Sequence, residues 1–206
     1  MNKQRSMPIS ILFAILCSIV LSGCALRPAD VSENPLTQSQ SLASLQQWQV
    51  NGKLAIITSQ ERKSASLNWR QQDQDISLLL SSVVGTTIAK LDYDGKIAIL
   101  NADNQTWQDR SPSALIFRTT GWQVPVEQLS EWMKGEVNAD IVDTKFDNGL
   151  VQSFTTQCEN CIPWKIQYNS YGKFEFEQGS LTLPTSMRLS QEASGTILIL
   201  RIDNWK

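Results

Sequence analysis

Apolar and polar residues alternate between Trp48 and Asn101, and this pattern narrows the possible folds of the chain more than any other. Successive side chains of a β-strand point to opposite faces, so a period of two predicts strands with one buried face. Turn residues such as Tyr93-Asp94-Gly95 separate the alternating segments. The predicted strands span residues 48–56, 64–70, 76–80, 88–93 and 96–101. Short strands joined by tight turns predict an antiparallel meander.

The pattern changes to helical spacing in the middle of the chain. Ser111-Pro112-Ser113 is a helix-start signal, and Pro125 opens a second amphipathic segment that ends at Gly135. Strands are predicted again from about residue 153, at 164–168, 173–177, 181–188 and 196–202. A helical insert between two sets of antiparallel strands indicates a mainly β fold with helices (α+β). We expect a barrel or strongly curved sheet whose opening is covered by the helices.

The N-terminal segment has the composition of a secretory signal. Lys3 and Arg5 precede an apolar run over residues 9–21, which is too short to cross a bilayer core of ~30 Å. The run ends in Leu21-Ser22-Gly23-Cys24, which resembles the lipobox of bacterial lipoproteins. That resemblance implies cleavage before Cys24, a diacylglycerol on its sulfur and an acyl group on its new amine. The alternative is an ordinary signal peptide that carries a cysteine by chance.

The residue after Cys24 bears on where the lipidated protein resides. In this class an Asp at that position usually signals retention at the inner membrane, whereas this chain has Ala25. We therefore expect a lipid-anchored protein at the outer membrane, facing the periplasm. Two or more acyl chains anchor a protein firmly, and we expect no cofactor besides these covalent lipids.

Three consecutive regions are predicted. Residues 1–23 are the signal peptide, which is removed, and residues 24–40 are the acylated cysteine and a flexible, polar tether. Residues 41–206 form a single domain, which we expect to be a monomer. A short amphipathic helix is predicted at its start, over residues 41–47.

The composition excludes several kinds of chemistry. The chain has no His, which rules out a Ser-His-Asp triad and a histidine-containing zinc site. It has no glycine-rich phosphate-binding loop, and Asp92, Asp94, Glu127 and Glu131 fall on predicted turns or outward helix faces, as solvated carboxylates do. We predict neither an enzyme nor a metal site, although catalysis by Asp and Glu alone or by a Ser-Lys pair stays open. The net charge of −2 gives no electrostatic attraction for nucleic acid.

Cys158 and Cys161 form a CxxC pair. In the oxidising periplasm a local disulfide across the predicted turn is favoured, with free thiols and redox catalysis as the alternatives. A loop this short adds little stability by the chain-entropy argument.

Two valines stand where a polar turn is expected, in the stretch Val83-Val84-Gly85 between two predicted strands. Gly85 can adopt a positive φ, which a β-branched residue cannot do at low cost, so it can make the bend and leave both valines at its tip. In the alternative interpretation, the strand continues and both valines pack against a neighbour.

Seven Trp are spread over the chain, and several fall on faces that are predicted to point inward. A well-filled core is the simplest explanation, but a curved sheet under helices can also enclose an apolar cavity. The candidate cavity residues are inward-facing apolar residues of the predicted strands and of the second helix: Trp48, Val50, Leu54, Ile56, Leu67, Trp69, Leu78, Leu80, Leu129, Trp132 and Met133.

Four stretches, taken in order, form a combination that is more specific than any one of them. They are WQVNGKLA (48–55), LNWRQQ leading into LLLSSVVGTT (67–87), GWQVPVEQLSEWMKG (121–135) and DNW (203–205). Together with the lipobox, this combination resembles the LolB family of outer-membrane lipoprotein receptors. Two features depart from the family pattern. Its members carry Pro-Leu before the turn glycine where this chain has Val83-Val84, so that Val84 matches the family's exposed Leu, and the CxxC pair is unusual.

The resemblance implies an incomplete antiparallel β-barrel that encloses an apolar cavity under a helical lid. It also implies that the cavity takes lipoprotein acyl chains from the soluble periplasmic carrier LolA and releases them into the outer-membrane lipid, with Val83, Val84 and Gly85 as the membrane-insertion loop. Two other functions stay open. One is a structural outer-membrane lipoprotein that scaffolds an envelope assembly, and the other is a lipid-processing enzyme, which the absence of His disfavours.

Overall fold

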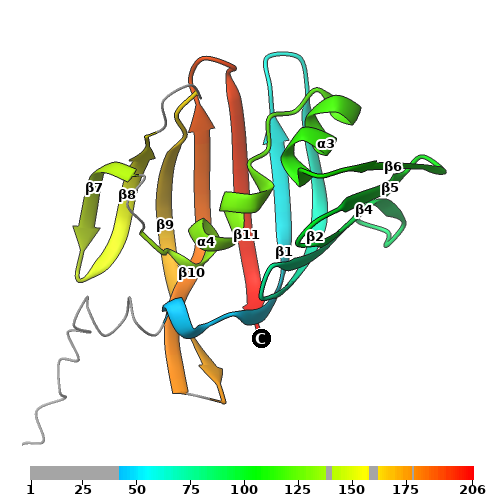
Figure 1. The fold of residues 1–206 in the computed structure, drawn as a ribbon. Coiled ribbons are helices and arrows are strands. Elements are labelled where there is room, and N and C mark those ends of the chain that lie inside the picture. Colours follow the sequence, from blue (N-terminus) through cyan, green and yellow to red (C-terminus); the bar gives the residue numbers. More distant parts are fainter. Residues whose placement is uncertain (1–41, 138–140, 158–161, 178) are drawn as a thin grey trace, which may run out of the picture. The chain divides into compact units, whose positions relative to one another are not determined.

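The computed structural model describes residues 42–137, 141–157, 162–177 and 179–206 (Figure 1). The first set of strands is β1 (Gln47–Ile57), β2 (Arg62–Gln72), β3 (Asp75–Ser81), β4 (Thr87–Asp94), β5 (Ala98–Ala102) and β6 (Gln105–Asp109). The helices α3 (Pro112–Thr120) and α4 (Val126–Lys134) follow. The second set of strands is β7 (Ile141–Asp147), β8 (Leu150–Thr156), β9 (Lys165–Phe176), β10 (Gly179–Gln191) and β11 (Thr196–Trp205). The predicted signal peptide, Cys24 and the predicted tether lie outside the described residues.

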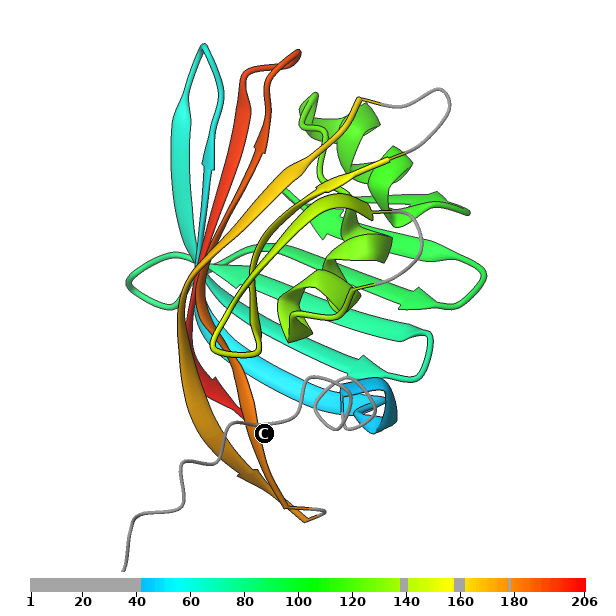
Figure 2. The same ribbon diagram turned by 90° about the vertical axis from the view of Figure 1, so that its left-hand side faces the viewer.

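The eleven strands of the described residues belong to one antiparallel sheet, in the order β6-β5-β4-β3-β2-β1-β11-β10-β9-β8-β7. The first and last strands therefore pair at its centre, and the chain passes through α3 and α4 on its way from one edge strand, β6, to the other, β7. The sheet curls around a concave face but does not close (Figure 2). The prediction of an incomplete antiparallel β-barrel with helices is confirmed.

The inner face of the sheet is apolar because every second side chain of a strand points to the same face. One row of facing, buried residues runs from β11 to β5 through Trp205, Val50, Trp69, Leu78, Leu91 and Leu100. Trp48 adds to this row, since its ring centroid lies 6.2 Å from that of Trp69 and 5.2 Å from that of Trp205. Three of the seven Trp thus pack against one another at the centre of the core.

The predicted starts of both helices and the predicted stop at Gly135 are confirmed. The Ser111 hydroxyl accepts a hydrogen bond from the backbone N–H of Ala114 at 3.1 Å, which caps α3. Gly121 and Gly135 follow the two helices in the left-handed conformation, with φ of 76° and 80°, as is common for glycine after a helix. The helix predicted over residues 41–47 is shorter than expected: only residues 42–44 are helical in the described part, and β1 begins at Gln47.

Three strands were missed in the sequence, and two predicted strands proved to be one. The strand β8 only overlaps the point near residue 153 from which strands were expected again, and no range was assigned to it. The other two missed strands, β6 and β7, are the edges of the sheet and are mostly exposed, so their residues lack the alternation that a buried face imposes. Residues 164–168 and 173–177 were predicted as separate strands but are both covered by the long β9 apart from their outermost residues. Polar residues interrupt the pattern of β9 where its pairing with β10 is shifted near Pro184.

The helices lie on the concave side of the sheet (Figure 2), and each is fixed to a different half of it. On α4, the ring of Trp132 packs at 6.1 Å from that of Phe154 in β8, and the Tyr168 hydroxyl of β9 donates to the Trp132 carbonyl at 2.6 Å. On α3, Arg118 pairs with Asp109 of β6 at 2.9 Å. The chain between α3 and α4 therefore bridges the two halves of the sheet. Among the described residues, neither helix has the length and apolar composition that a membrane crossing requires.

Candidate functional site

A partly open pocket of about 350 Å³ lies between the end of β1 and the start of β2, the end of β3 and the start of β4, and the segment that links α3 to α4. Its lining is mainly apolar, and the polar members Lys63 and Ser64 belong to the start of β2. The lining residues are Leu54, Ile56, Lys63, Ser64, Ala65, Leu80, Ile88 and Trp122. The volume falls within the range of roughly 300–1,000 Å³ that is typical of small-molecule sites. With so few polar groups, the pocket suits an apolar guest.

Polar contacts hold the one aromatic side chain of this lining in place. The Trp122 indole N–H donates to a Glu61 carboxylate oxygen at 2.9 Å. The other carboxylate oxygen pairs with the Lys63 ammonium at 3.0 Å, and that ammonium lies 5.1 Å from the centroid of the Trp122 ring. The hydrogen bond from Lys63 is the main reason why the pKa of Glu61 is lowered, and the bond from Trp122 adds to it against desolvation. Glu61 is therefore ionised at neutral pH.

The loop next to this pocket is a tight turn with an apolar tip. The Ser82 carbonyl accepts from the Gly85 N–H at 2.9 Å, and the Ser82 N–H donates to the Thr86 carbonyl at 2.8 Å. Gly85 has a φ of 87°, so the three-residue loop has the glycine that such hairpins need. Val83 and Val84 are 97% and 88% exposed. The alternative in which both valines pack against a neighbour does not hold in this structure.

The position of this loop relates it to the pocket. It joins β3 to β4 and projects from the sheet on the side away from α3 and α4 (Figure 2). Leu80 and Ile88 flank the loop on its two strands, and both line the pocket. An apolar surface at the tip and an apolar hollow at the base are thus separated by only a few residues of the same hairpin.

Comparisons with known proteins agree with this geometry. The sequence profile of the family described as outer membrane lipoprotein LolB matches residues 46–205. The chain belongs to the LolB family.

The match extends to individual LolB proteins. The chain is 33% identical to the outer-membrane lipoprotein LolB of Aeromonas hydrophila over 94% of its own length and 95% of the relative's. It is 29% identical to that of a Shewanella strain (MR-4) over its whole length and 94% of the relative's. The chain is accordingly an outer-membrane lipoprotein of the lipoprotein-localisation pathway, and it is not an enzyme.

Solved structures support the fold. A LolA superfamily protein from Nitrosomonas europaea superposes with a TM-score of 0.54 at 9% identity, covering 82% of this chain and 93% of that one. A DUF1329 family protein from Desulfovibrio piger superposes with a TM-score of 0.51 at 11% identity, covering 84% of this chain and 90% of that one. At these identities the likeness concerns the unclosed, curled sheet alone.

The predicted cavity residues of this LolB-family chain separate into two groups. Leu54, Ile56 and Leu80 line the pocket described above. The remaining candidates are buried in the packed core: Trp48, Val50, Leu67, Trp69, Leu78, Leu129, Trp132 and Met133. Cys24, Cys158 and Cys161 lie outside the described residues, so their lipidation or pairing stays a prediction.

Sequence reasoning did not single out Ala65, Ile88 or Trp122 as pocket residues. The signal for Ala65 was present, because it alternates with Leu67 and Trp69 on the inward face of β2. Ile88 directly follows the turn, where the strand pattern has just begun. Trp122 lies between two helices, where no periodicity indicates the direction of a side chain.

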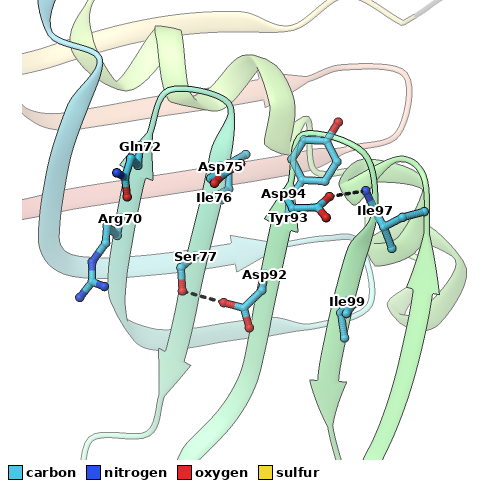
Figure 3. A pocket seen from close by; sticks show the side chains of 10 residues that line it. All are labelled: Arg70, Gln72, Asp75, Ile76, Ser77, Asp92, Tyr93, Asp94, Ile97 and Ile99. Carbon is cyan, nitrogen blue, oxygen red and sulfur yellow. Dashed lines mark hydrogen bonds between the residues drawn. The ribbon is translucent and has the colours of Figure 1, made fainter.

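A second hollow, of about 400 Å³, lies along β2 to β5 and has a different chemistry (Figure 3). Arg70, Asp75 and Asp92 are among its lining residues. Ser77 donates to Asp92 at 2.8 Å, and the Asp94 carboxylate accepts from the backbone N–H groups of the following turn, foremost that of Ile97, which lowers the pKa of Asp94. The Asp92 carboxylate thus stabilises the pairing of β3 with β4, and that of Asp94 stabilises the turn between β4 and β5, as expected for surface groups.

Glu127 differs from the expectation of a solvated carboxylate. It is half-buried and accepts hydrogen bonds from the hydroxyls of Ser111 and Ser113 and from the Ser113 N–H. Ser113 in turn accepts from the Val126 N–H at 2.8 Å. The carboxylate therefore ties the first turn of α4 to the first turn of α3, where a negative charge is favoured.

Proposed function

We propose that this LolB-family lipoprotein binds the acyl chains of other lipoproteins in its apolar pocket, accepts them from the periplasmic carrier LolA and inserts them into the outer membrane. The observation that carries the proposal is the apolar pocket on the concave side of the sheet, adjoining a hairpin with an exposed apolar tip. In this proposal the protein acts as a monomer, anchored through lipids on Cys24.

Energetics favour transfer from one apolar site to another. Burial is worth about 0.8 kcal/mol per CH₂ group, so a chain of ~16 carbons left in water would cost on the order of 10 kcal/mol. No nucleotide is needed if each successive site holds the chain slightly better than the last. The lining of Leu54, Ile56 and Leu80 offers the receptor such a site. Membrane lipid is the final one.

The exposed valines suit the release step. Burial of two valine side chains contributes a few kcal/mol at most, which is enough for contact with lipid but not for stable insertion. Permanent attachment would come from the acyl groups on Cys24. The loop would therefore touch the bilayer at the moment of release, and this contact would hold the pocket close to the membrane surface.

Binding of an environment-sensitive fatty-acid probe tests the proposal. The full chain carrying Cys24→Ala is used so that it bears no acyl group of its own. We expect saturable probe fluorescence that an acylated lipoprotein competes away. Ala65→Phe, which fills the pocket, should lower the affinity at least tenfold, whereas the matched Ala193→Phe in the exposed β10–β11 turn should not.

Three results would count against acyl binding. Probe fluorescence that does not saturate, or equal affinities for Ala65→Phe and Ala193→Phe in folded protein, would remove the pocket from the mechanism. Saturable binding that no lipoprotein displaces would favour the structural alternative, a scaffold for an envelope assembly.

A further inference from the structure

Three side chains meet at the edge of the apolar pocket and connect two parts of the chain that are distant in sequence. Trp122 comes from the segment between α3 and α4, Glu61 from the turn between β1 and β2, and Lys63 from the start of β2. The Trp122 indole N–H donates a hydrogen bond to the Glu61 carboxylate at 2.9 Å, and this carboxylate forms an ion pair with the Lys63 ammonium at 3.0 Å. The Lys63 ammonium lies 5.1 Å from the centroid of the indole ring. We call these three residues the clasp.

The clasp holds the indole against the pocket. Trp122 and Lys63 both line the cavity, so two of the three clasp residues are walls of the space that a guest would occupy. The indole is only half-buried, and the acceptor of its N–H, the Glu61 carboxylate, lies at the protein surface. The ring packs against the core, but unlike the buried core Trp residues it is partly exposed, and its contacts with Glu61 and Lys63 lie at the surface.

The surroundings allow this indole to move without disturbing either helix. Gly121, in the left-handed conformation, ends α3 just before Trp122, and Pro125 precedes α4. The helices themselves are fixed through Arg118 to β6 and through Trp132 to β8 and β9. Val124 is buried in the core and adds an anchor of its own, so the motion is confined to residues 121–123 and above all to the Trp122 side chain.

We propose that Trp122 is a gate over the acyl pocket, that Glu61 and Lys63 latch it in the empty protein, and that an entering acyl chain displaces it. This inference rests on the proposed function. The ligand it concerns is an acyl chain, since the lining of the pocket is apolar apart from Lys63 and Ser64. Opening breaks one hydrogen bond and one ring–cation contact, both at the surface, where water can replace them.

A gate of this kind reduces the apparent affinity for the guest. If the pocket is competent for only a fraction of the time, the observed dissociation constant equals the intrinsic one divided by that fraction. Weakening the latch raises this fraction, so the affinity should increase. A wall that merely contacts the guest would give the opposite result, because its removal takes contacts away.

The same fatty-acid probe and the full chain with Cys24→Ala provide the test. Trp122→Phe keeps an aromatic ring but removes the N–H donor, and Glu61→Ala removes the acceptor. Each should tighten probe binding about two- to tenfold, the effect expected of one lost hydrogen bond. The double variant should gain no more than the stronger single one, because both changes break the same bond. Glu192→Ala, which removes an exposed carboxylate from the β10–β11 turn, should leave the affinity unchanged.

The outcomes separate the gate from the proposed function. Saturable binding by the parent chain with unchanged or weaker binding by Trp122→Phe and Glu61→Ala would overturn the gate and leave the acyl pocket intact. Independent, additive effects of the two changes would show that Trp122 and Glu61 do not act through their shared bond, which also overturns the latch. Absence of probe binding by the parent chain would instead refute the proposed function on which the gate depends. Thermal unfolding of each variant confirms that the comparison is made on folded protein.

Discussion

Val84 combines nearly full exposure with a position at the tip of a well-formed turn. The hydrogen bonds that close the turn join Ser82 to Gly85 and Thr86, and all of them involve backbone groups or the Ser82 side chain. The valine side chains therefore contribute nothing to the turn that holds them. Only contact with another molecule can shield these side chains from water, and in the proposed function that molecule is membrane lipid.

We predict that Val84→Glu leaves folding and acyl binding intact but blocks release into membranes. A carboxylate at this tip would have to enter the lipid surface, which is costly, whereas at 88% exposure it disturbs no packing in the protein. Transfer of a lipoprotein from the receptor to vesicles is the measurement, with Phe146→Glu on the exposed face of β7 as the control. If Val84→Glu lowers the unfolding temperature by more than the control does, the valine has a structural role that the proposed function does not include.

Gly52 marks a close approach between the two central strands. A Cβ atom at this position would clash with the backbone oxygen of Arg201 in β11, next to the irregularity in pairing at Asn51 and Gly52. We therefore expect Gly52→Ala to destabilise the domain by about 1–3 kcal/mol, as overpacking does. Urea unfolding measures this, and Lys53→Ala, exposed in the same strand, should be nearly neutral. A Gly52→Ala variant as stable as the parent would mean that β1 and β11 can move apart without cost.

At the scale of single residues, the sequence indicated some features and could not indicate others. The exposure of Val83 and Val84 was predictable because Gly85 identifies the bend. The contact between Trp122 and Glu61 was not predictable, because it joins two segments that only the curled sheet brings together. The face to which a strand side chain points follows from the alternation along the strand. No such rule gives the direction of a side chain in a segment between two helices.

Helices α3 and α4 form the element that spans the open sheet, and Glu127 joins them. The α4 carboxylate accepts from two α3 hydroxyls, and this arrangement places both helix starts in one hydrogen-bonded cluster. We predict that Glu127→Ala destabilises the domain by roughly 1–3 kcal/mol, since it leaves partly buried donors without their charged acceptor. Thermal unfolding provides the measurement, with exposed Gln128→Ala as the control. Equal unfolding temperatures for the two variants would contradict this role for Glu127.

At the scale of elements, burial decided which strands could be predicted. Strands that line the core, such as β1 and β2, alternate clearly because one face must be apolar. The edge strands β6 and β7 have no such constraint, and their pairing comes from backbone hydrogen bonds that any sequence can make. The helix ends were readable because Ser111 and Gly135 satisfy specific backbone needs there.

At the scale of the whole domain, the curled sheet forms a core that is mostly filled, with the pocket at one end of it. Most of the predicted cavity residues fill this core, as the packing of Trp48 with Trp69 and Trp205 illustrates. From the sequence alone, a Trp that fills the core and a Trp that lines a cavity look the same. The curvature of the sheet and the path of the segment between α3 and α4 decide which Trp fills the core and which lines the cavity. Both are properties of the assembled fold.

The domain should become more stable when an acyl chain occupies the pocket. A ligand that binds only the folded state at 100 times its dissociation constant contributes about 2.7 kcal/mol, and for a domain of this size that corresponds to a rise of roughly 5–10 °C in Tm. We predict such a rise for the full chain carrying Cys24→Ala on addition of a fatty acid, measured by calorimetry. Ala65→Phe should lose most of the shift, because its ring occupies the space of the chain, while Ala193→Phe should keep it. A Tm that rises equally in both variants would place the fatty acid elsewhere, since only the first fills the pocket between β1, β2 and Trp122.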